Sequence, residues 1–300
     1  MASRITARRT FEGRTLRSFG VMKCYLTLFV MPPSAWAAWT FIWTVATKFF
    51  IPQYLEKIHI MRVRVKHVDH PLDGRVPFDP GLLPVYMRFI NFWVDTIAML
   101  ETKFGVWKGS LLGARLLRRL RLAYSSAYKV YSYCMTTTDR PASDDKGIKA
   151  LRRADPHFFC VPSLHIAICV LNYFFYKKLF SDPDIDFTED EKAAWLSELR
   201  EEGFAIGRSV LFLKQHSVNC LPAALYMMCR ITPDLFTPDD ARTCISGLLP
   251  PAENIAPENK AEITAYISSL FDLLINDAEG EKDWTLPLKN WLDSYQAMKA

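Results

Sequence analysis

Long uncharged stretches dominate the hydrophobic pattern of this chain. Residues 24–47 and 156–176 contain no Asp, Glu, Lys or Arg over 24 and 21 positions. Each stretch is long enough to cross about 30 Å of hydrocarbon as a helix. The pattern therefore predicts membrane-spanning helices. The alternative is a soluble helical protein whose apolar stretches form the core, and the mean hydropathy of only +0.02 leaves it open.

Three further apolar stretches bring the expected number of spans to about six. Residues 83–100 are apolar apart from Arg88 and Asp95, which lie two helical turns apart on one face and favour either a span with an internal ion pair or an interfacial helix. Residues 122–138 form the next stretch. Residues 204–231 are better divided into two short spans than kept as one, since buried charges in a single long span are costly. The expected fold is an all-α, multi-pass membrane helical bundle.

The other segments are polar. Residues 181–202 predict a soluble helix, because a capping box begins at Thr188 and Trp195 and Leu199 share one apolar stripe. After residue 232, a capping signal at Thr237 and a second apolar stripe predict a helical tail. We therefore expect three parts: a basic cytoplasmic N-terminal segment (1–23), a membrane bundle carrying the site (24–231), and an acidic soluble tail (232–300).

The net charge of +5 conceals a division along the chain. Residues 1–156 hold 25 Lys and Arg against 11 Asp and Glu, while residues 157–300 hold 12 against 21. The basic residues flank apolar segments instead of alternating with exposed aromatics, so we expect no nucleic-acid partner. Read as topology signals, they place the N-terminus and the tail on the cytoplasmic side of the membrane.

The cysteines and histidines indicate neither a disulfide framework nor a metal centre. The seven cysteines contain no CxxC pair, and most lie in apolar stretches. The run from His67 to His70 has no second pair at ligand spacing, so we read it as a polar loop. We expect no metal and no cofactor.

Three short motifs fall at the expected outer ends of spans: 136–141 with Arg140, 161–165 with His165, and 214–220 with His216. An Arg and two His residues suit phosphoryl transfer. Arg140 can bind two phosphate oxygens, while one imidazole attacks phosphorus and the other protonates the departing alkoxide. A helix beginning at Pro162 would turn its N-terminal N–H groups and the Ser163 hydroxyl toward the phosphate.

These motifs resemble, in kind and in order, those of the phosphatidic acid phosphatase type 2 superfamily. The run Pro-Ser-Leu-His165 and the pair Gln215-His216 are most similar to the branch of inositol and lipid phosphotransferases. The resemblance covers about residues 122–231. It implies that His216 is a nucleophile forming a phosphohistidine, that His165 is the general acid, and that the phosphate ligands are Arg140, Ser163 and Lys214.

The chain departs from the family pattern at three positions. Tyr133 stands where the first motif has Lys, Val210 where the third motif has Arg, and Cys220 where an Asp would orient the nucleophile. A thiol is a poor acceptor for an imidazole N–H. If that Asp were the missing element, Cys220→Asp would raise kcat by about tenfold or more.

The sequence thus predicts an enzyme, a membrane lipid-phosphate phosphatase or phosphotransferase that works without metal. Its expected substrate is a phospholipid or polyprenyl phosphate at the outer membrane face. The alternative is a catalytically inactive membrane scaffold of the same fold, which binds a protein partner through its acidic tail.

Overall fold

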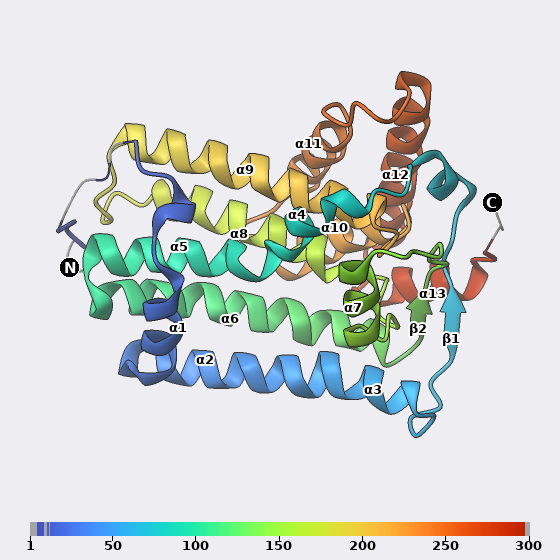
Figure 1. The fold of residues 1–300 in the computed structure, drawn as a ribbon, viewed down its shortest axis with the longest axis horizontal. Helices are drawn as coiled ribbons and strands as arrows, with labels where there is room; N and C mark the ends of the chain where they lie inside the picture. Colours follow the sequence, from blue (N-terminus) through green and yellow to red (C-terminus); the bar gives the residue numbers. More distant parts are fainter. Residues whose placement is uncertain (1–4, 9–10, 12, 298–300) are drawn as a thin grey trace.

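Long helices lying side by side form the body of the protein in the computed structural model, which describes residues 5–8, 11 and 13–297 (Figure 1). The long elements are α2 (Pro32–Val45), α5 (Phe89–Phe104), α6 (Val106–Tyr131), α8 (Leu164–Phe180) and α9 (Glu189–Phe212). Helix α6 is central, because α2, α5 and α8 all pack against it.

Shorter elements extend this body at both ends. The remaining α-helices are α1 (Val21–Val30), α3 (Ile51–Lys57), α4 (Leu83–Met87), α7 (Lys146–Ala154), α10 (Cys220–Ile231), α11 (Pro238–Leu248), α12 (Pro257–Asp277) and α13 (Leu286–Ser294). The short helical turns are η1 (Leu16–Ser18), η2 (Ala46–Phe50), η3 (Pro71–Arg75) and η4 (Pro80–Leu82).

A small parallel sheet joins two distant parts of the chain. Strand β1 (Val65–His67) pairs with β2 (Met135–Thr137), with Lys66 opposite Thr136. Thr136 also forms a bridge to Phe159. The sheet therefore brings the segment that precedes Arg140 next to the segment that precedes α8.

The predicted multi-pass membrane bundle is wrong. Within the described ranges, no helix combines the length and the apolar character needed to cross a bilayer. The predicted topology placed both ends of the chain in the cytoplasm and the site on the outer face. It depended on those spans and is therefore wrong as well. The same holds for the functional descriptions that treat the chain as a membrane-spanning protein.

Prolines divide the first expected span, residues 24–47, between two helices. Helix α1 ends at Val30 and α2 begins at Pro32, with Met31 as the joint between them. A proline lacks the N–H that a continuous helix needs, which makes the first position of a new helix its usual place. The apolar character of the segment is real: Trp36, for example, lies on the outer side of α2 and is 78% exposed.

Two other expected spans, residues 83–100 and 204–231, are each divided between two helices. Arg88 ends α4 and caps α5, and its guanidinium contacts Asp95 at 2.5 Å and Glu202 of α9 at 2.8 Å. The predicted ion pair is therefore present, but it ties α5 to an acidic helix. Residues 204–231 divide between the end of α9 and α10, with a turn between them.

The charge division reflects contacts within the chain. Of the predicted basic segment 1–23, residues 1–4, 9, 10 and 12 lie outside the described residues. In the described part, the backbone N–H of Leu16 donates to Glu198 at 2.7 Å, and Arg17 pairs with Glu202 at 3.2 Å. The basic N-terminal segment thus lies along the acidic side chains of α9.

The segment after residue 232 packs on the same core as the rest. Helices α11 and α12 contact α10, and α11 also contacts α9. Residues from Leu16 to Leu292 belong to one continuous hydrophobic cluster. The end of the tail reaches the β1 side of the molecule, where Tyr295 donates to the carbonyl of Asp69 at 2.6 Å.

Candidate functional site

Two helix ends bring His165 and His216 together. His165 is the second residue of α8, and His216 lies in the turn that follows α9. Nδ1 of His165 is 3.2 Å from Nε2 of His216. The two predicted histidines, 51 residues apart in the chain, are therefore in direct contact.

A backbone carbonyl sets the orientation of His216. Its Nδ1 lies 3.1 Å from the carbonyl oxygen of Cys160. Since a carbonyl only accepts hydrogen bonds, Nδ1 carries the proton and Nε2 keeps its lone pair. Burial, helped by the positive charge of His157, lowers the pKa of His216 to about 3. The ring is neutral at neutral pH, as a nucleophile must be.

Burial also keeps His165 neutral. It lowers the pKa of His165 to about 3, and the neighbouring His216 contributes in the same direction. The ring lies among the aromatic side chains of Tyr86 and Phe89, with ring centres 4.7 and 4.4 Å away. In this state His165 donates an N–H bond but holds no extra proton for a leaving group.

Arg140 approaches the pair through an intermediate glutamine. It follows β2, and its Nη1 lies 3.5 Å from Oε1 of Gln215 and 3.9 Å from Oδ2 of Asp155. Gln215 is the residue before His216 and is only 1% exposed. The three predicted motifs thus meet in one region of the molecule.

Two residues near Arg140 carry unused hydrogen-bond donors. Nε2 of Gln215, and Nε and Nη2 of Arg152 from α7, are buried without a partner in the described part of the chain. Burial lowers the pKa of Arg152, and the charge of Arg140 lowers it further, which indicates that the two guanidinium groups are near each other. Buried donors normally have acceptors, so these donors are available to an anionic ligand.

A cavity of about 430 Å³ opens onto the histidines. Its polar end includes His165, His216, Gln215 and Asp155. Its remaining wall is almost entirely apolar and comes mainly from α2, η2, α4 and α5, including Phe41, Phe49, Met87, Ile90 and Trp93. Such a shape suits a ligand with a polar head and a large apolar group.

The side chains of Ser163 and Lys214 form hydrogen bonds with backbone groups of the protein. The Ser163 hydroxyl caps α8 by accepting from the N–H of Ile166 at 3.4 Å, so the helix begins at Leu164 and not at Pro162 as expected. Nζ of Lys214 donates to the backbone carbonyl of Asp73 at 2.5 Å and to that of Val76. The Lys214 ammonium therefore binds the η3 segment and is not directed at a phosphate.

The three departures from the family pattern also have structural explanations. The Tyr133 hydroxyl donates to Asp293 of α13 at 2.5 Å, and the Val210 side chain is fully buried in the hydrophobic core. Cys220 is fully buried and shares a hydrogen bond with the Cys160 thiol. The neighbouring Asn219 contacts Tyr266 and Tyr295. Cys220 and Asn219 thus have other partners, whereas the Cys160 carbonyl orients His216.

Sequence reasoning missed a second group of side chains in the same cavity. Sγ of Cys160 lies 3.6 Å from Nε2 of His157, and Nδ1 of His157 lies 3.7 Å from Asp155. Burial opposes charge on both, yet hydrogen bonds from Cys220 and His157 lower the pKa of Cys160. The negative charges of Cys160 and Asp155 raise the pKa of His157 to about 9. The only sequence signal was the Asp155-x-His157-x-x-Cys160 spacing.

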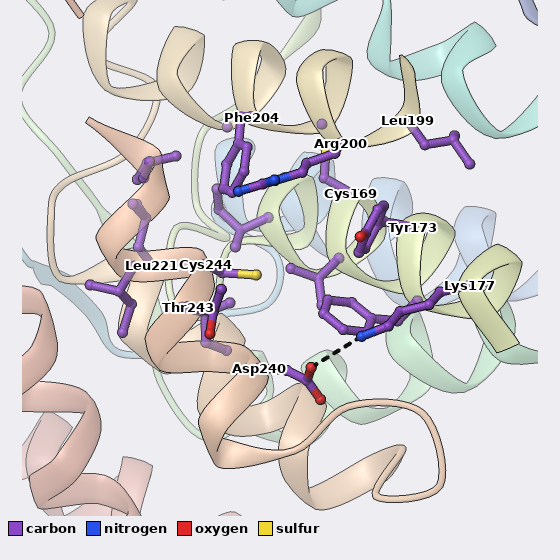
Figure 2. A pocket seen from close by; sticks show the side chains of 18 of the residues that line it. Cys169, Tyr173, Lys177, Leu199, Arg200, Phe204, Leu221, Asp240, Thr243 and Cys244 are labelled. Atoms are coloured by element: carbon purple, nitrogen blue, oxygen red, sulfur yellow. Dashed lines mark ion pairs between the residues drawn. The ribbon is translucent and has the colours of Figure 1, made fainter. Parts of the chain in front are cut away.

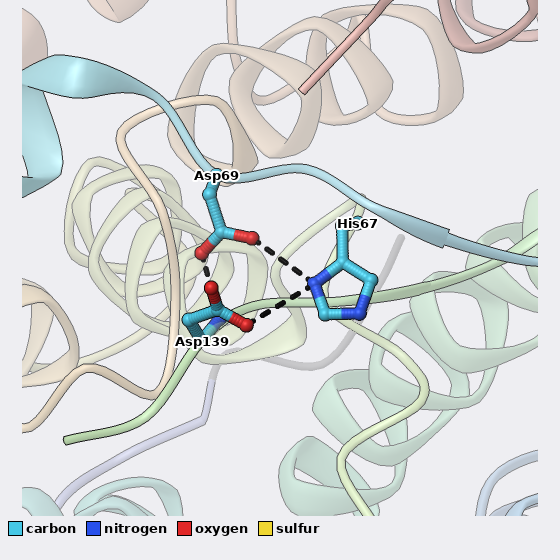
Figure 3. A group of neighbouring side chains, drawn as sticks. All are labelled: His67, Asp69 and Asp139. Atoms are coloured by element: carbon cyan, nitrogen blue, oxygen red, sulfur yellow. Dashed lines mark hydrogen bonds and ion pairs between the residues drawn. The ribbon is translucent and has the colours of Figure 1, made fainter. Parts of the chain in front are cut away.

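The His67 region forms a polar cluster outside the cavity (Figure 3). Nδ1 of His67 lies 3.3 Å from a carboxylate oxygen of Asp69 and 3.3 Å from one of Asp139. The backbone N–H of Asp139 also donates to Asp69 at 2.7 Å. These bonds link β1 to the loop that carries Arg140, which gives the cluster a structural role as a positioning contact.

Comparison of the chain with models of known protein families, with curated proteins and with solved structures gives no match. The resemblance to the phosphatase superfamily therefore rests on the motif residues and their geometry.

Proposed function

We propose that this protein transfers phosphoryl groups from a phosphate ester through a phosphohistidine formed at His216. The observation that carries the proposal is the buried amide donor of Gln215 without an acceptor, beside two neutral histidines in contact and within 3.5 Å of the Arg140 guanidinium. A phosphate bound there would accept from Gln215 and form with Arg140 the charge-assisted bonds that guanidinium groups form best.

The first step is attack on phosphorus. Nε2 of His216 forms the new P–N bond as the P–O bond to the alcohol breaks, and the leaving oxygen takes a proton from His165. Resting His165 lacks that extra proton, but the negative charge of a bound phosphate would raise its pKa. Because His165 now donates to the same Nε2 lone pair, phosphate binding must displace His165 from His216.

The second step removes the phosphoryl group from His216. Water or an alcohol attacks the phosphohistidine, His165 accepts the proton of the incoming hydroxyl, and the P–N bond breaks. The Cys160 carbonyl holds Nδ1–H throughout, which stabilises the ring as it gains positive charge. These steps use two histidine side chains and a backbone carbonyl, and they need no metal ion.

The cavity wall supports a substrate with a large apolar group. Its aromatic and aliphatic lining extends from the histidines across α2 and α5. We propose a phospholipid or polyprenyl phosphate, with the phosphate at the donors and the hydrocarbon along this wall.

The test is phosphate release from phosphatidic acid and from a polyprenyl phosphate, each in detergent micelles with EDTA present. We expect turnover by the wild type and none by His216→Ala, while His59→Ala, which alters an exposed histidine, keeps full activity. Label from a ³²P substrate should stay on the protein in alkali and leave in acid. Substrate binding with no turnover by the wild type would reject the enzyme in favour of a protein that binds the phosphate ester without catalysis.

A second candidate function is thiol-dependent acyl transfer. The arrangement of Cys160, His157 and Asp155 in the same cavity favours it, because a thiol with a lowered pKa beside a histidine is a nucleophile. Acyl transfer would form a thioester at Sγ and release an alcohol or amine. Cys160→Ser would abolish ester hydrolysis in that case, whereas the phosphoryl-transfer proposal requires phosphate release to survive this substitution.

A further inference from the structure

A second cavity lies on another side of α8, between α8, α9, α10, α11 and α12 (Figure 2). Its volume is about 230 Å³, and none of its described lining residues belongs to the wall of the histidine cavity. In α8 the lining residues Cys169, Tyr173 and Lys177 follow one another at helical spacing. The cavity is therefore a separate space enclosed by one face of each helix.

The interior of this cavity is uncharged. Its lining is mainly aliphatic and aromatic, including Phe204, Leu221 and Leu225. Cys244 belongs to the lining, and burial raises the pKa of its thiol to about 12, with the nearby Asp240 acting in the same direction. The thiol is therefore protonated at neutral pH, and the interior offers a ligand only apolar contact.

The rim is charged, and the charges do not cancel. Nζ of Lys177 lies 3.6 Å from Asp240, as the dashed line in Figure 2 shows. Arg200 of α9 forms no ion pair within the described ranges, and its guanidinium carbon lies 5.7 Å from the centre of the Phe204 ring. One cation, that of Arg200, thus remains at the rim without a carboxylate partner.

The α9 backbone helps to keep the space open. A Cβ at Gly207 would lie 3.3 Å from Cδ1 of Ile166 and 3.3 Å from Cδ1 of Leu248, two lining side chains. Contacts this short would push those side chains aside. Glycine at 207 therefore allows α8 and α11 to approach α9 without filling the space between them.

We propose that this cavity binds an aliphatic carboxylate of medium chain length. The hydrocarbon chain occupies the apolar interior, and the carboxylate pairs with Arg200, whose planar fork matches its two oxygens. Apolar cavities of about 150 Å³ accept a benzene molecule, so this larger space accommodates a longer hydrocarbon group. An alkyl ammonium binds poorly because the unpaired charge of Arg200 repels it.

Sodium decanoate is the probe, titrated by calorimetry into the purified full chain below its micelle concentration. We expect binding that is weakened about tenfold in Arg200→Gln, because a hydrogen-bonded charge pair is lost. Arg121→Gln removes an exposed arginine elsewhere and should bind as wild type does. His216→Ala should also leave decanoate binding unchanged, which separates this site from the proposed catalytic one.

Two further measurements decide the outcome. Cys244→Phe places a ring in the cavity and should abolish binding. Arg200→Glu, a change at an exposed position, should bind decyltrimethylammonium more tightly than decanoate. The proposal is overturned if wild type binds decyltrimethylammonium as tightly as decanoate. It is equally overturned if Arg200→Glu shows no change in preference or if folded Cys244→Phe still binds decanoate.

Discussion

The carbonyl oxygen of Cys160 lies 3.1 Å from Nδ1 of His216 and holds that ring in a single tautomer. In catalytic groups of this kind the orienting acceptor is commonly a carboxylate, which also stabilises the charged ring. A carbonyl supplies the orientation with a partial charge only. The chain therefore orients its candidate nucleophile without the Asp that the resembling family has at the position of Cys220.

The first prediction is that Cys220→Asp will not raise kcat. Cys220 is completely buried and its thiol interacts with Cys160, so a carboxylate there would be desolvated and would not orient His216. Burying an unpaired carboxylate should lower the free energy of unfolding by at least about 2 kcal/mol. Urea unfolding and steady-state kinetics test both statements. Cys220→Ser is the matched control, and a tenfold gain in kcat for Cys220→Asp would restore the original expectation.

The second prediction concerns acid stability. The pKa values of His165 and His216 are lowered to about 3, whereas an unfolded histidine titrates near 6.5. Between these values the unfolded state binds more protons, so stability falls as the pH drops from about 6.5 toward 3. Each ring contributes a slope of up to about 1.4 kcal/mol per pH unit.

The double variant His165→Gln/His216→Gln isolates this contribution. Carboxylates elsewhere titrate in both proteins, so the difference in unfolding free energy between wild type and variant is the informative quantity. We expect that difference to shrink steadily from pH 6.5 to 4. A difference independent of pH would mean that the two rings are not held neutral by burial.

The candidate site was partly predictable because its chemistry lies in short motifs. The helix start near His165 and the turn at His216 could be recognised locally, and a shared phosphate was the reason to expect contact between them. Gln215 was noticed only as the neighbour of His216, and Arg152 gave no such signal. The position of Arg152 depends on how α7 docks beside the Arg140 loop, which is a long-range relationship that local patterns do not encode.

The fold was predicted only in its helical character. Hydropathy measures how apolar a segment is and does not reveal what covers it, so a segment buried against other helices resembles one buried in lipid. The details that break the expected spans were visible, namely Pro32-Pro33 and Arg88. Their effect depended on a partner far away in sequence, since Glu202 holds Arg88 from 114 residues away.

The third prediction compares two tryptophans. Trp195 is 1% exposed, and its Nε1 donates to the carbonyl of Arg14 at 2.8 Å, while Trp36 is 78% exposed. Trp195→Ala should lower the free energy of unfolding by about 3–5 kcal/mol, through loss of buried surface and the cavity left behind. Trp36→Ala should change it by no more than about 0.5 kcal/mol. Urea unfolding measures both, and equal losses would contradict the placement of α2 at the edge of the bundle.

The last prediction tests Arg152 as a phosphate ligand. Its Nη1 donates to the carbonyl of Pro141 at 2.6 Å, which leaves Nε and Nη2 as the unpartnered donors near Arg140. Arg152→Gln should raise KM for the phosphate substrate about tenfold and lower kcat much less, because a charged hydrogen bond to bound phosphate is lost in ground and transition states alike. Arg152→Lys should restore little, since an ammonium cannot replace two donors of a planar fork.

The neighbouring Arg153 is exposed, so Arg153→Gln is the matched control and should keep the wild-type KM. Competitive inhibition by inorganic phosphate gives an independent measure of the same contact. An Arg152→Gln protein that keeps its KM and its phosphate inhibition would show that these donors face something other than the substrate, and Arg140 with Gln215 would then be left as the anion-binding groups.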